Sequence, residues 1–213
     1  AGTRRIYRFD IGGGEPKPVT REHSFDSLAI AGSGPVIVGL RQSFTEPPTL
    51  VSIIARTGTA TKLSDFNDAA VADLTQGRVE SVTYKGANGD DVQMWVVYPP
   101  NFTTDRKWPL YMLLHGGPHN GVTDGIQWRW NAQVFANWGY VTAWHNFHGS
   151  SGFGQAWTDS ITKEWADLPY QAASGLSFDD VTPPECLEQA AELIGYDEFR
   201  RHPESLKALQ REA

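Results

Sequence analysis

One short segment of the chain contains residue types that suit acyl-transfer chemistry. The tetrapeptide His115-Gly116-Gly117-Pro118 directly follows an apolar run over residues 110–114. Two adjacent glycines let a backbone turn sharply and approach a ligand closely. Their N–H groups can then point at the negative charge that develops on a carbonyl oxygen during acyl transfer. The segment therefore predicts an oxyanion-binding turn, with an ordinary glycine-rich turn between a strand and a helix as the alternative.

The serine nucleophile that such a turn would serve is not visible in the sequence. In an α/β-hydrolase the nucleophile lies in a Gly-x-Ser-x-Gly elbow between a strand and a helix. Ser150 and Ser151 each lack one of the two glycines, and Ser177 lacks both the second glycine and a preceding apolar strand. Asp197 and His202 follow in the order expected of a triad, but no later strands are present to position them. We therefore expect no complete catalytic triad.

Other kinds of site have weaker support. Cys186 is the only cysteine, which excludes an internal disulfide and a cysteine-rich metal site. His145 and His148 have no carboxylate or cysteine at ligand spacing. The triple glycine at residues 12–14 lacks the Lys-Ser/Thr pair of a phosphate-binding loop. We therefore expect neither a metal nor an organic cofactor.

Charge and hydropathy exclude two classes of partner. The formal net charge is −7, and no basic run is longer than two residues, which argues against a nucleic-acid-binding surface. No apolar run reaches the roughly 18 residues that a membrane span requires. Because the chain starts at Ala1 without a charged and then apolar leader, we interpret it as a soluble fragment or processed chain. The sequence does not decide between cytoplasm and periplasm, and it does not define the oligomeric state.

The segments around the glycine pair predict a hairpin followed by alternating strands and helices. Residues 79–84 and 92–98 alternate in polarity around an Asn88-Gly89 turn, as in a β-hairpin. The apolar run at 110–114 predicts a strand buried on both faces of a parallel sheet. A helix is expected over residues 127–138, because Trp130, Val134 and Trp138 recur at helical spacing. A buried strand at 140–144 and a helix at 155–165 are expected to follow.

The first 70 residues predict β-structure. Short β-rich runs recur between glycine and proline punctuation, at residues 5–11, 27–30, 35–40 and 49–55. Four or five strands of this length amount to about one four-stranded propeller blade with an additional edge strand. A single blade contains no repeat, so these residues alone do not establish a propeller.

Two longer segments resemble the catalytic domain of the prolyl oligopeptidase family. The segment Trp108 to His119 is similar to the start of that domain, and residues 138–154 are similar to its next strand and loop. Leu168-Pro169-Tyr170 resembles the stretch before its following helix. Within the family the similarity is greatest to enzymes of the acylaminoacyl-peptidase and dipeptidyl-peptidase type. The resemblance implies a serine-type peptidase that hydrolyses short peptides through an acyl-enzyme.

The resemblance also implies roles for three residues. The family's oxyanion donor in this loop corresponds to the backbone N–H of Gly117. His115 stands where some relatives have a tyrosine whose hydroxyl assists the oxyanion, although a structural role is favoured for this imidazole. His119 is a candidate for lining the substrate cleft, with a solvated loop histidine as the alternative.

The resemblance further implies a division of the chain into three parts. The expected fold class is α/β, with the N-terminal part of an α/β-hydrolase sheet at residues 76–170 preceded by a β-propeller remnant at residues 1–75. The resemblance ends near Tyr170, and residues 171–213 predict a helical tail that does not match the family. We therefore expect a fragment truncated before the nucleophile, lacking the triad and inactive alone.

Two alternatives stay open. One is a carboxylesterase of the same fold, and the other is a non-catalytic, hydrolase-like binding module. The β-rich N-terminal segment favours the peptidase, because simple esterases lack a propeller. A peptide substrate is the partner that the peptidase hypothesis implies for the intact parent enzyme.

Overall fold

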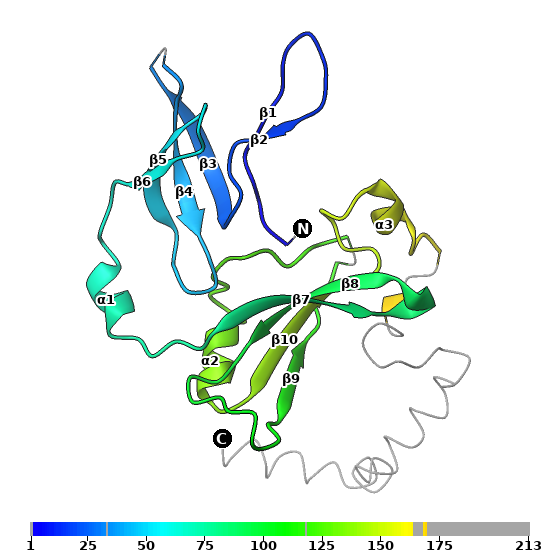
Figure 1. Ribbon diagram of the computed structural model, residues 1–213. Helices are drawn as coiled ribbons and strands as arrows, with labels where there is room; N and C mark the ends of the chain where they lie inside the picture. The colour runs from blue at the N-terminus through cyan, green and yellow to red at the C-terminus, as the bar shows by residue number, and fades with distance from the viewer. Residues whose placement is uncertain (1, 33, 118, 164–167, 170–213) are drawn as a thin grey trace, which may run out of the picture.

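A computed structural model describes residues 2–32, 34–117, 119–163 and 168–169 of the chain. The sequence-based hypotheses on Ser177, Cys186, Asp197, His202 and the predicted helical tail lie outside these residues. The described part forms two four-stranded sheets, a short two-stranded ribbon and three short helices (Figure 1). No helix in this part is both long and apolar enough to cross a membrane.

The elements follow one another in a simple order. They are β1 (Tyr7–Arg8), β2 (Lys17–Pro18), β3 (Ser24–Ala31), β4 (Val36–Gln42), β5 (Thr49–Ile54), β6 (Ala60–Lys62), α1 (Asp68–Ala72), β7 (Val79–Lys85), the 3-10 turn Ala87–Gly89, β8 (Asp91–Val97), β9 (Leu110–Leu113), α2 (Ala132–Asn137), β10 (Val141–Asn146) and α3 (Gln155–Asp159).

The first sheet is an antiparallel meander in the order β3-β4-β5-β6. Strand β5 alternates buried and less buried residues, as a strand with one covered face does. Its inward side chains, Val51 and Ile53, form a small core with Ile6 and Phe25. The predicted strands at residues 27–30, 35–40 and 49–55 are confirmed. The predicted strand at residues 5–11 is wrong in extent, because only Tyr7 and Arg8 pair, with β2.

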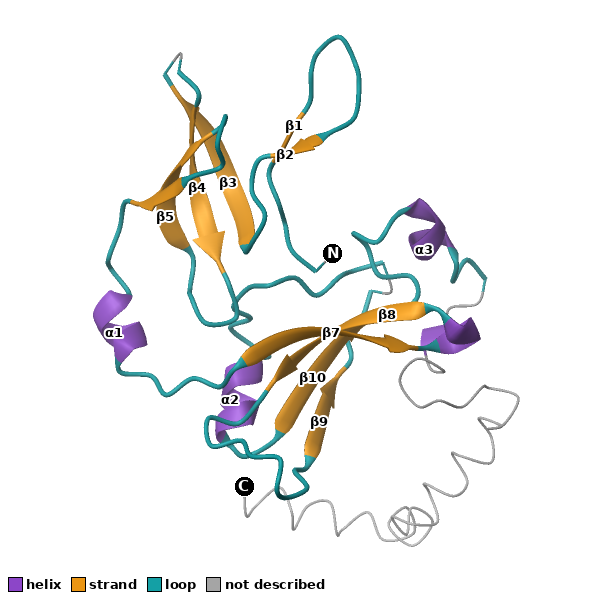
Figure 2. Ribbon diagram, in the orientation of Figure 1, coloured by secondary structure: helices purple, strands orange, loops and turns teal. Residues whose placement is uncertain are grey.

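The second sheet has the order β7-β8-β10-β9 (Figure 2). Strands β7 and β8 form the predicted hairpin, and Asn88 and Gly89 at its turn have φ values of 57° and 74°. Strand β10 pairs antiparallel with β8 and parallel with β9. Helix α2 connects the two parallel strands and packs on the sheet through Ala132 and Ala136. A hairpin followed by strand, helix and strand is the order that the sequence predicts.

The predicted helix at residues 127–138 is wrong in length and in its buried face. Helix α2 begins after Asn131, whose side chain accepts a hydrogen bond from the Gln133 N–H as an N-cap. The predicted apolar stripe is exposed, with Trp130 at 47%, Val134 at 44% and Trp138 at 67%. Small alanines face the sheet instead, because they let the helix approach its strands closely. The three side chains of the predicted stripe therefore point away from the described core, whereas Phe135 packs against it.

The prediction that residues 110–114 are buried on both faces is also wrong for the described part. Strand β9 lies at the edge of the described sheet, with Leu110 58% and Leu114 61% exposed. Of this run, Leu113 is buried in the core cluster and Tyr111 packs against that cluster, which α2 covers from one side. An apolar run shows that both faces of a strand are able to be buried. In the described sheet β9 is an edge strand, so part of its apolar surface is not covered. The helix predicted over residues 155–165 is present as α3, over Gln155–Asp159.

Candidate active site

The glycine pair lies where two parallel strands end. Strands β9 and β10 are parallel neighbours, with Met112 opposite Ala143 and Leu113 opposite Trp144. Their carboxyl ends therefore lie at the same edge of the sheet, which is where ligands bind in open α/β sheets. The segments that follow them meet there. We call residues 115–122 the glycine loop and residues 147–154 the β10 loop.

Gly117 has a backbone conformation that favours glycine, with φ at 69°. Its carbonyl oxygen accepts a hydrogen bond from the Asn120 N–H at 2.9 Å, which closes a tight turn. A Cβ atom at Gly117 would lie 3.1 Å from Asn120 Nδ2, whereas one at Gly116 would meet nothing within 4 Å. The two adjacent glycines therefore differ, and only Gly117 is required as glycine by both conformation and contact.

The N–H group of Gly117 donates to no acceptor among the described residues. Gly117 is exposed, so this donor can reach an external acceptor. A preorganised backbone N–H without an internal partner is what the stabilisation of an oxyanion requires. This is the chemical capability of the turn.

His115 is held by the β10 loop. Its ring stacks on Phe147 with centroids 4.3 Å apart, and its Nε2 lies 2.9 Å from Ser150 Oγ. Its Nδ1 lies 3.3 Å from the carbonyl oxygen of Gly116. Burial lowers the pKa of His115, so the ring is neutral near pH 7. With Nδ1–H directed at a carbonyl, Nε2 accepts the Ser150 hydroxyl, and both ring nitrogens are engaged.

The contact between Ser150 and His115 is not arranged as a nucleophile and its base. Ser150 is fully buried, so a peptide has no access to its Oγ. His115 faces a carbonyl oxygen rather than the carboxylate that orients a catalytic base. Ser151 is exposed, and its N–H donates to the Asn120 carbonyl at 3.0 Å. The geometry therefore argues against Ser150 as nucleophile.

His119 is an exposed residue at the rim of the same edge. Its Nδ1 lies 3.3 Å from the carbonyl oxygen of Gly149, so it adds one more contact between the two loops. A cavity of about 220 Å³ lies between the two loops and the N-terminal segment; its lining includes the next residue, Asn120, but not His119 itself. Residues 120–123 and 151–153 line this cavity together with Gly2, Thr3 and Arg4. His119 thus stays a candidate for contact with substrate.

The two histidines that the sequence places outside any metal site are buried structural residues. His145 Nδ1 lies 2.7 Å from Tyr84 Oη, and burial, together with the nearby His115, lowers the pKa of His145 to about 4. Burial raises the pKa of Tyr84 to about 12. His148 Nε2 lies 3.0 Å from Asp90, and its ring stacks on Trp157. In the described residues, no group of three or more His, Cys, Asp or Glu side chains could hold a metal ion.

Two polar residues of the site are not identified by the sequence, because they belong to no known motif. Asn146 ends β10 and contacts the glycine loop, and Asp124 follows that loop and accepts a hydrogen bond from the Phe44 N–H at 2.9 Å. Asp124 Oδ2 also lies 3.3 Å from His23 Nδ1, so it joins the second sheet to the first. For Asn146 the sequence offers one signal, a polar side chain at the end of an apolar strand. This signal has no fixed spacing from its partners in the sequence, so it does not identify them.

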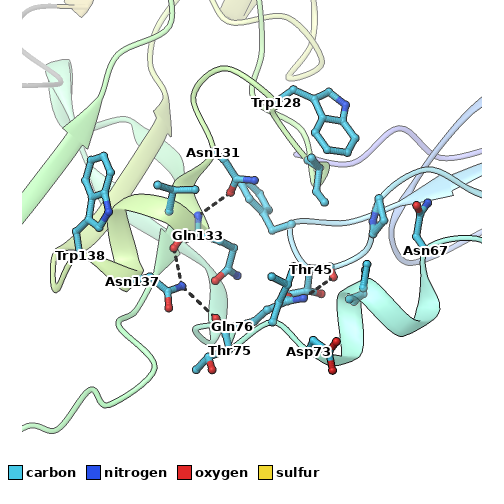
Figure 3. A pocket seen from close by; sticks show the side chains of 17 residues that line it. Thr45, Asn67, Asp73, Thr75, Gln76, Trp128, Asn131, Gln133, Asn137 and Trp138 are labelled. Atoms are coloured by element: carbon cyan, nitrogen blue, oxygen red, sulfur yellow. Dashed lines mark hydrogen bonds between the residues drawn. The ribbon is translucent and has the colours of Figure 1, made fainter.

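A larger cavity of about 580 Å³ lies elsewhere, on the outer side of α2 (Figure 3). Trp128 and Trp138 stand on opposite sides of it, and α1 and residues 73–76 contribute further walls. Gln76 Nε2 donates to the Thr45 carbonyl, and Asn137 Nδ2 donates to the Thr75 carbonyl. No residue of the glycine loop lines this cavity, so it is separate from the candidate active site.

The fold and the site together define a class of protein. The structure has a hairpin, then a strand, a helix and a parallel strand, with a glycine turn directly after the first parallel strand, and this arrangement is typical of an α/β-hydrolase fold. The acylaminoacyl peptidase of Pyrococcus horikoshii has a similar structure, with a TM-score of 0.67, 20% identity and coverage of 80% of this chain and 26% of that one. A puromycin-hydrolysing peptidase of Mycobacterium tuberculosis gives a TM-score of 0.61 at 19% identity, over 79% and 26% of the two chains.

The sequence comparisons narrow this class to one family. Residues 126–172 match the profile of the prolyl oligopeptidase family. The chain is 33% identical to dipeptidyl-peptidase 5 of Schizosaccharomyces pombe over 154 residues, which are 72% of this chain and 22% of that protein. It is 41% identical to a probable dipeptidyl-peptidase 5 of Aspergillus terreus over 104 residues, 49% of this chain and 14% of that protein. This chain belongs to the prolyl oligopeptidase family of serine peptidases.

The chain spans only a part of its relatives. It covers about a fifth of the length of the curated dipeptidyl-peptidase 5 of Schizosaccharomyces pombe and about a quarter of the similar solved structures. The resemblance inferred from residues 108–119 and 138–154 is confirmed at the level of the family. The sheet-rich α/β fold is confirmed as well.

Proposed function

We propose that this chain supplies the glycine-loop half of the oxyanion hole of a serine peptidase that hydrolyses short peptides through an acyl-enzyme. The observation that carries this proposal is the N–H group of the exposed residue Gly117, which has no acceptor among the described residues. When a nucleophile attacks the scissile carbonyl, negative charge develops on the carbonyl oxygen. The Gly117 N–H donates to that oxygen, and the tetrahedral intermediate is stabilised relative to the bound peptide.

A second oxyanion donor is required in this fold. It comes from the N–H of the residue after the nucleophile, in the Gly-x-Ser-x-Gly elbow. The sequence contains no such elbow. Loss of a triad member leaves only about 10³–10⁴-fold catalysis over water, which comes from the oxyanion hole and from binding. We therefore propose that the 213-residue chain alone does not hydrolyse peptides.

Short peptides are the proposed substrate class of the intact parent enzyme. The names dipeptidyl-peptidase 5 and acylaminoacyl peptidase, given to two kinds of relative, support this choice. The antiparallel sheet β3-β4-β5-β6 supports a peptidase over an esterase, because it has the strand order of one propeller blade. We propose residues 1–75 as the last part of a propeller and residues 76–170 as the first part of the hydrolase domain.

The first test uses the chain itself. The purified 213-residue protein is incubated with an aminoacyl-nitroanilide and with a fluorophosphonate probe. We expect neither nitroaniline release nor covalent labelling. Serine-dependent labelling would contradict the proposed absence of a nucleophile.

The second test combines the glycine loop with the catalytic triad and the second oxyanion donor of a relative. Residues 76–170 replace the corresponding segment of the Schizosaccharomyces pombe dipeptidyl-peptidase 5, which is 33% identical to this chain. We expect the hybrid enzyme to react with fluorophosphonate and to hydrolyse a dipeptidyl substrate. A hybrid that reacts with the probe but turns over no peptide would contradict the proposal. If that hybrid still bound peptides, a non-catalytic binding module would be favoured.

A further inference from the structure

A buried amide at the end of β10 holds the far end of the glycine loop. Asn146 is fully buried and is the last residue of β10. Its Oδ1 accepts a hydrogen bond from the Val122 N–H at 2.6 Å, and its Nδ2 donates to the Val122 carbonyl at 3.0 Å. One side chain therefore satisfies both backbone polar groups of a residue that is itself buried in the core cluster.

The orientation of this amide is fixed by its partners. A backbone N–H must face the side-chain oxygen, and a backbone carbonyl must face the NH₂ group. The second hydrogen of Nδ2 is directed at Gln93 Oε1, at 2.6 Å, and Gln93 Nε2 donates in turn to Ser81 Oγ at 2.9 Å. Trp95 Nε1 donates a second hydrogen bond to the Val122 carbonyl, at 3.3 Å. The glycine loop is thus linked to three strands of the sheet.

The two ends of the glycine loop are anchored in different ways. At the near end, His115 is held by Ser150 and Phe147 of the β10 loop. At the far end, Val122 is held by Asn146. Gly117 lies between these anchors, and its N–H has no partner of its own among the described residues. The direction of that N–H therefore depends on both anchors.

We propose that Asn146 is a positioning residue for the oxyanion donor, acting through Val122 on the orientation of the Gly117 N–H. The inference rests on the proposed function, because it assigns Gly117 that role. An oxyanion hole is effective when its donors are fixed before the reaction begins. A leucine of similar size would leave the Val122 N–H unpaired in the core and would remove one of the two donors to the Val122 carbonyl, so packing alone does not replace the amide.

The chain provides a matched control at a distant position. Gln133 on α2 is buried and holds a single residue in the same way, because its Oε1 accepts from the Gly77 N–H at 2.8 Å and its Nε2 donates to the Gly77 carbonyl at 3.0 Å. Asn146→Asp and Gln133→Glu both replace the donating NH₂ by an oxygen and retain the shape. Only the first change affects a residue of the glycine loop.

The structural experiment measures amide hydrogen exchange and ¹⁵N–¹H spectra of the full 213-residue chain. Asn146→Ala removes the acceptor of the Val122 N–H, and we expect the Val122 amide to exchange at least about tenfold faster, which corresponds to the loss of about one hydrogen bond. Asn146→Asp keeps this acceptor but places a second oxygen against the Val122 carbonyl, so we expect a smaller acceleration there. The Gly117 signal should shift or broaden in both variants. Gln133→Glu should accelerate exchange at Gly77 and leave Gly117 unchanged. An unchanged Gly117 signal in a folded Asn146 variant overturns the proposal.

The kinetic experiment uses the hybrid enzyme described above. Asn146→Asp is expected to lower kcat about tenfold at nearly constant KM, whereas Gln133→Glu leaves both within about twofold. Equal losses in the two variants would mean general destabilisation and would reject the positioning role. If the Gly117 signal responds to Asn146 but the unsubstituted hybrid is inactive, the proposed function fails while the structural link from Asn146 to Gly117 stands.

Discussion

The two four-stranded sheets of this molecule bury different kinds of polar group. In the described first part of the chain, the buried polar side chains are hydroxyls, namely Thr20, Ser24, Ser43 and Thr49. In the second part they include the amides and imidazoles of Gln93, Gln133, His145, Asn146 and His148. Groups with several hydrogen-bonding atoms are costly to bury unless they are satisfied. They gather in and around the second sheet, so the kind of polar group that is buried distinguishes the first sheet from the part of the molecule with the candidate site.

The largest expected effect is a loss of stability in the first sheet that is not shared by the second sheet. Ile53 is fully buried in the first sheet, and Ile53→Ala should cost about 2–5 kcal/mol of unfolding free energy. All eight tryptophans lie at residue 95 or later, so tryptophan emission reports only on the second part. Denaturation followed by far-ultraviolet circular dichroism should shift more than denaturation followed by tryptophan emission. Ile54→Ala is the control, because Ile54 is 42% exposed. Equal shifts by both probes would mean that the sheets unfold as one unit.

The next effect concerns the connection between the sheets. Asp124→Ala leaves the buried Phe44 N–H without its acceptor and removes the contact to His23, at a cost of about 1–3 kcal/mol. Asp124→Asn keeps an acceptor oxygen and should cost less. The separation between the two denaturation transitions should widen in the alanine variant. The connection would be unsupported if the alanine and asparagine variants behaved alike.

Acid should weaken the second sheet selectively. Burial lowers the pKa of His145 from 6.5 to about 4, so the unfolded chain takes up this proton at higher pH than the folded chain does. The stability associated with neutral His145 is therefore complete above pH 6.5 and falls between pH 6.5 and 4. The expected loss at about pH 5 is about 2 kcal/mol, measured by tryptophan emission during urea denaturation. His145→Gln should remove most of this dependence. A variant with the same pH profile as the natural chain would contradict the assignment to His145.

The smallest expected effect compares the two adjacent glycines. Gly117→Ala forces an alanine into a positive φ beside Asn120 and should cost about 1–2 kcal/mol. Gly116→Ala meets open space and should cost less than about 0.5 kcal/mol. Thermal unfolding monitored by tryptophan emission distinguishes them. Similar costs at both positions would show that the turn does not depend on the conformation of Gly117.

The order in which the elements of the second sheet follow one another along the chain could be predicted from local signals. The Asn88-Gly89 step marks its hairpin, and the apolar runs mark β9 and β10, because these patterns depend only on neighbouring residues. The burial of β9 and the orientation of α2 could not be predicted. Both depend on which elements cover a surface, and hydrophobicity gives only the capacity for burial. Trp130 and Trp138 show this directly, since they have helical spacing and yet stay exposed.

Of the candidate site, the backbone turn could be predicted from the sequence, but the side-chain contacts that hold it could not. A glycine pair after an apolar strand identifies the turn, and φ at Gly117 agrees with the need for glycine there. Asn146 was missed, because its partner Val122 lies 24 residues away along the chain and no motif links them. The contact between Ser150 and His115 was missed for the same reason, because only the fold brings the Ser150 hydroxyl to His115. Side-chain contacts between loops are set by tertiary packing, and a single sequence does not contain that information in any local pattern.

The most direct test of the central claim compares Gly117→Ala with Gly116→Ala in the hybrid peptidase. The two changes add the same methyl group to neighbouring positions, and only the first should redirect the proposed oxyanion donor. We predict that Gly117→Ala lowers kcat by about 10²–10³-fold, the loss typical of an oxyanion donor, while Gly116→Ala stays within about threefold of the unsubstituted hybrid. Equal kcat values for the two variants, at equal fluorophosphonate labelling, would contradict the claim.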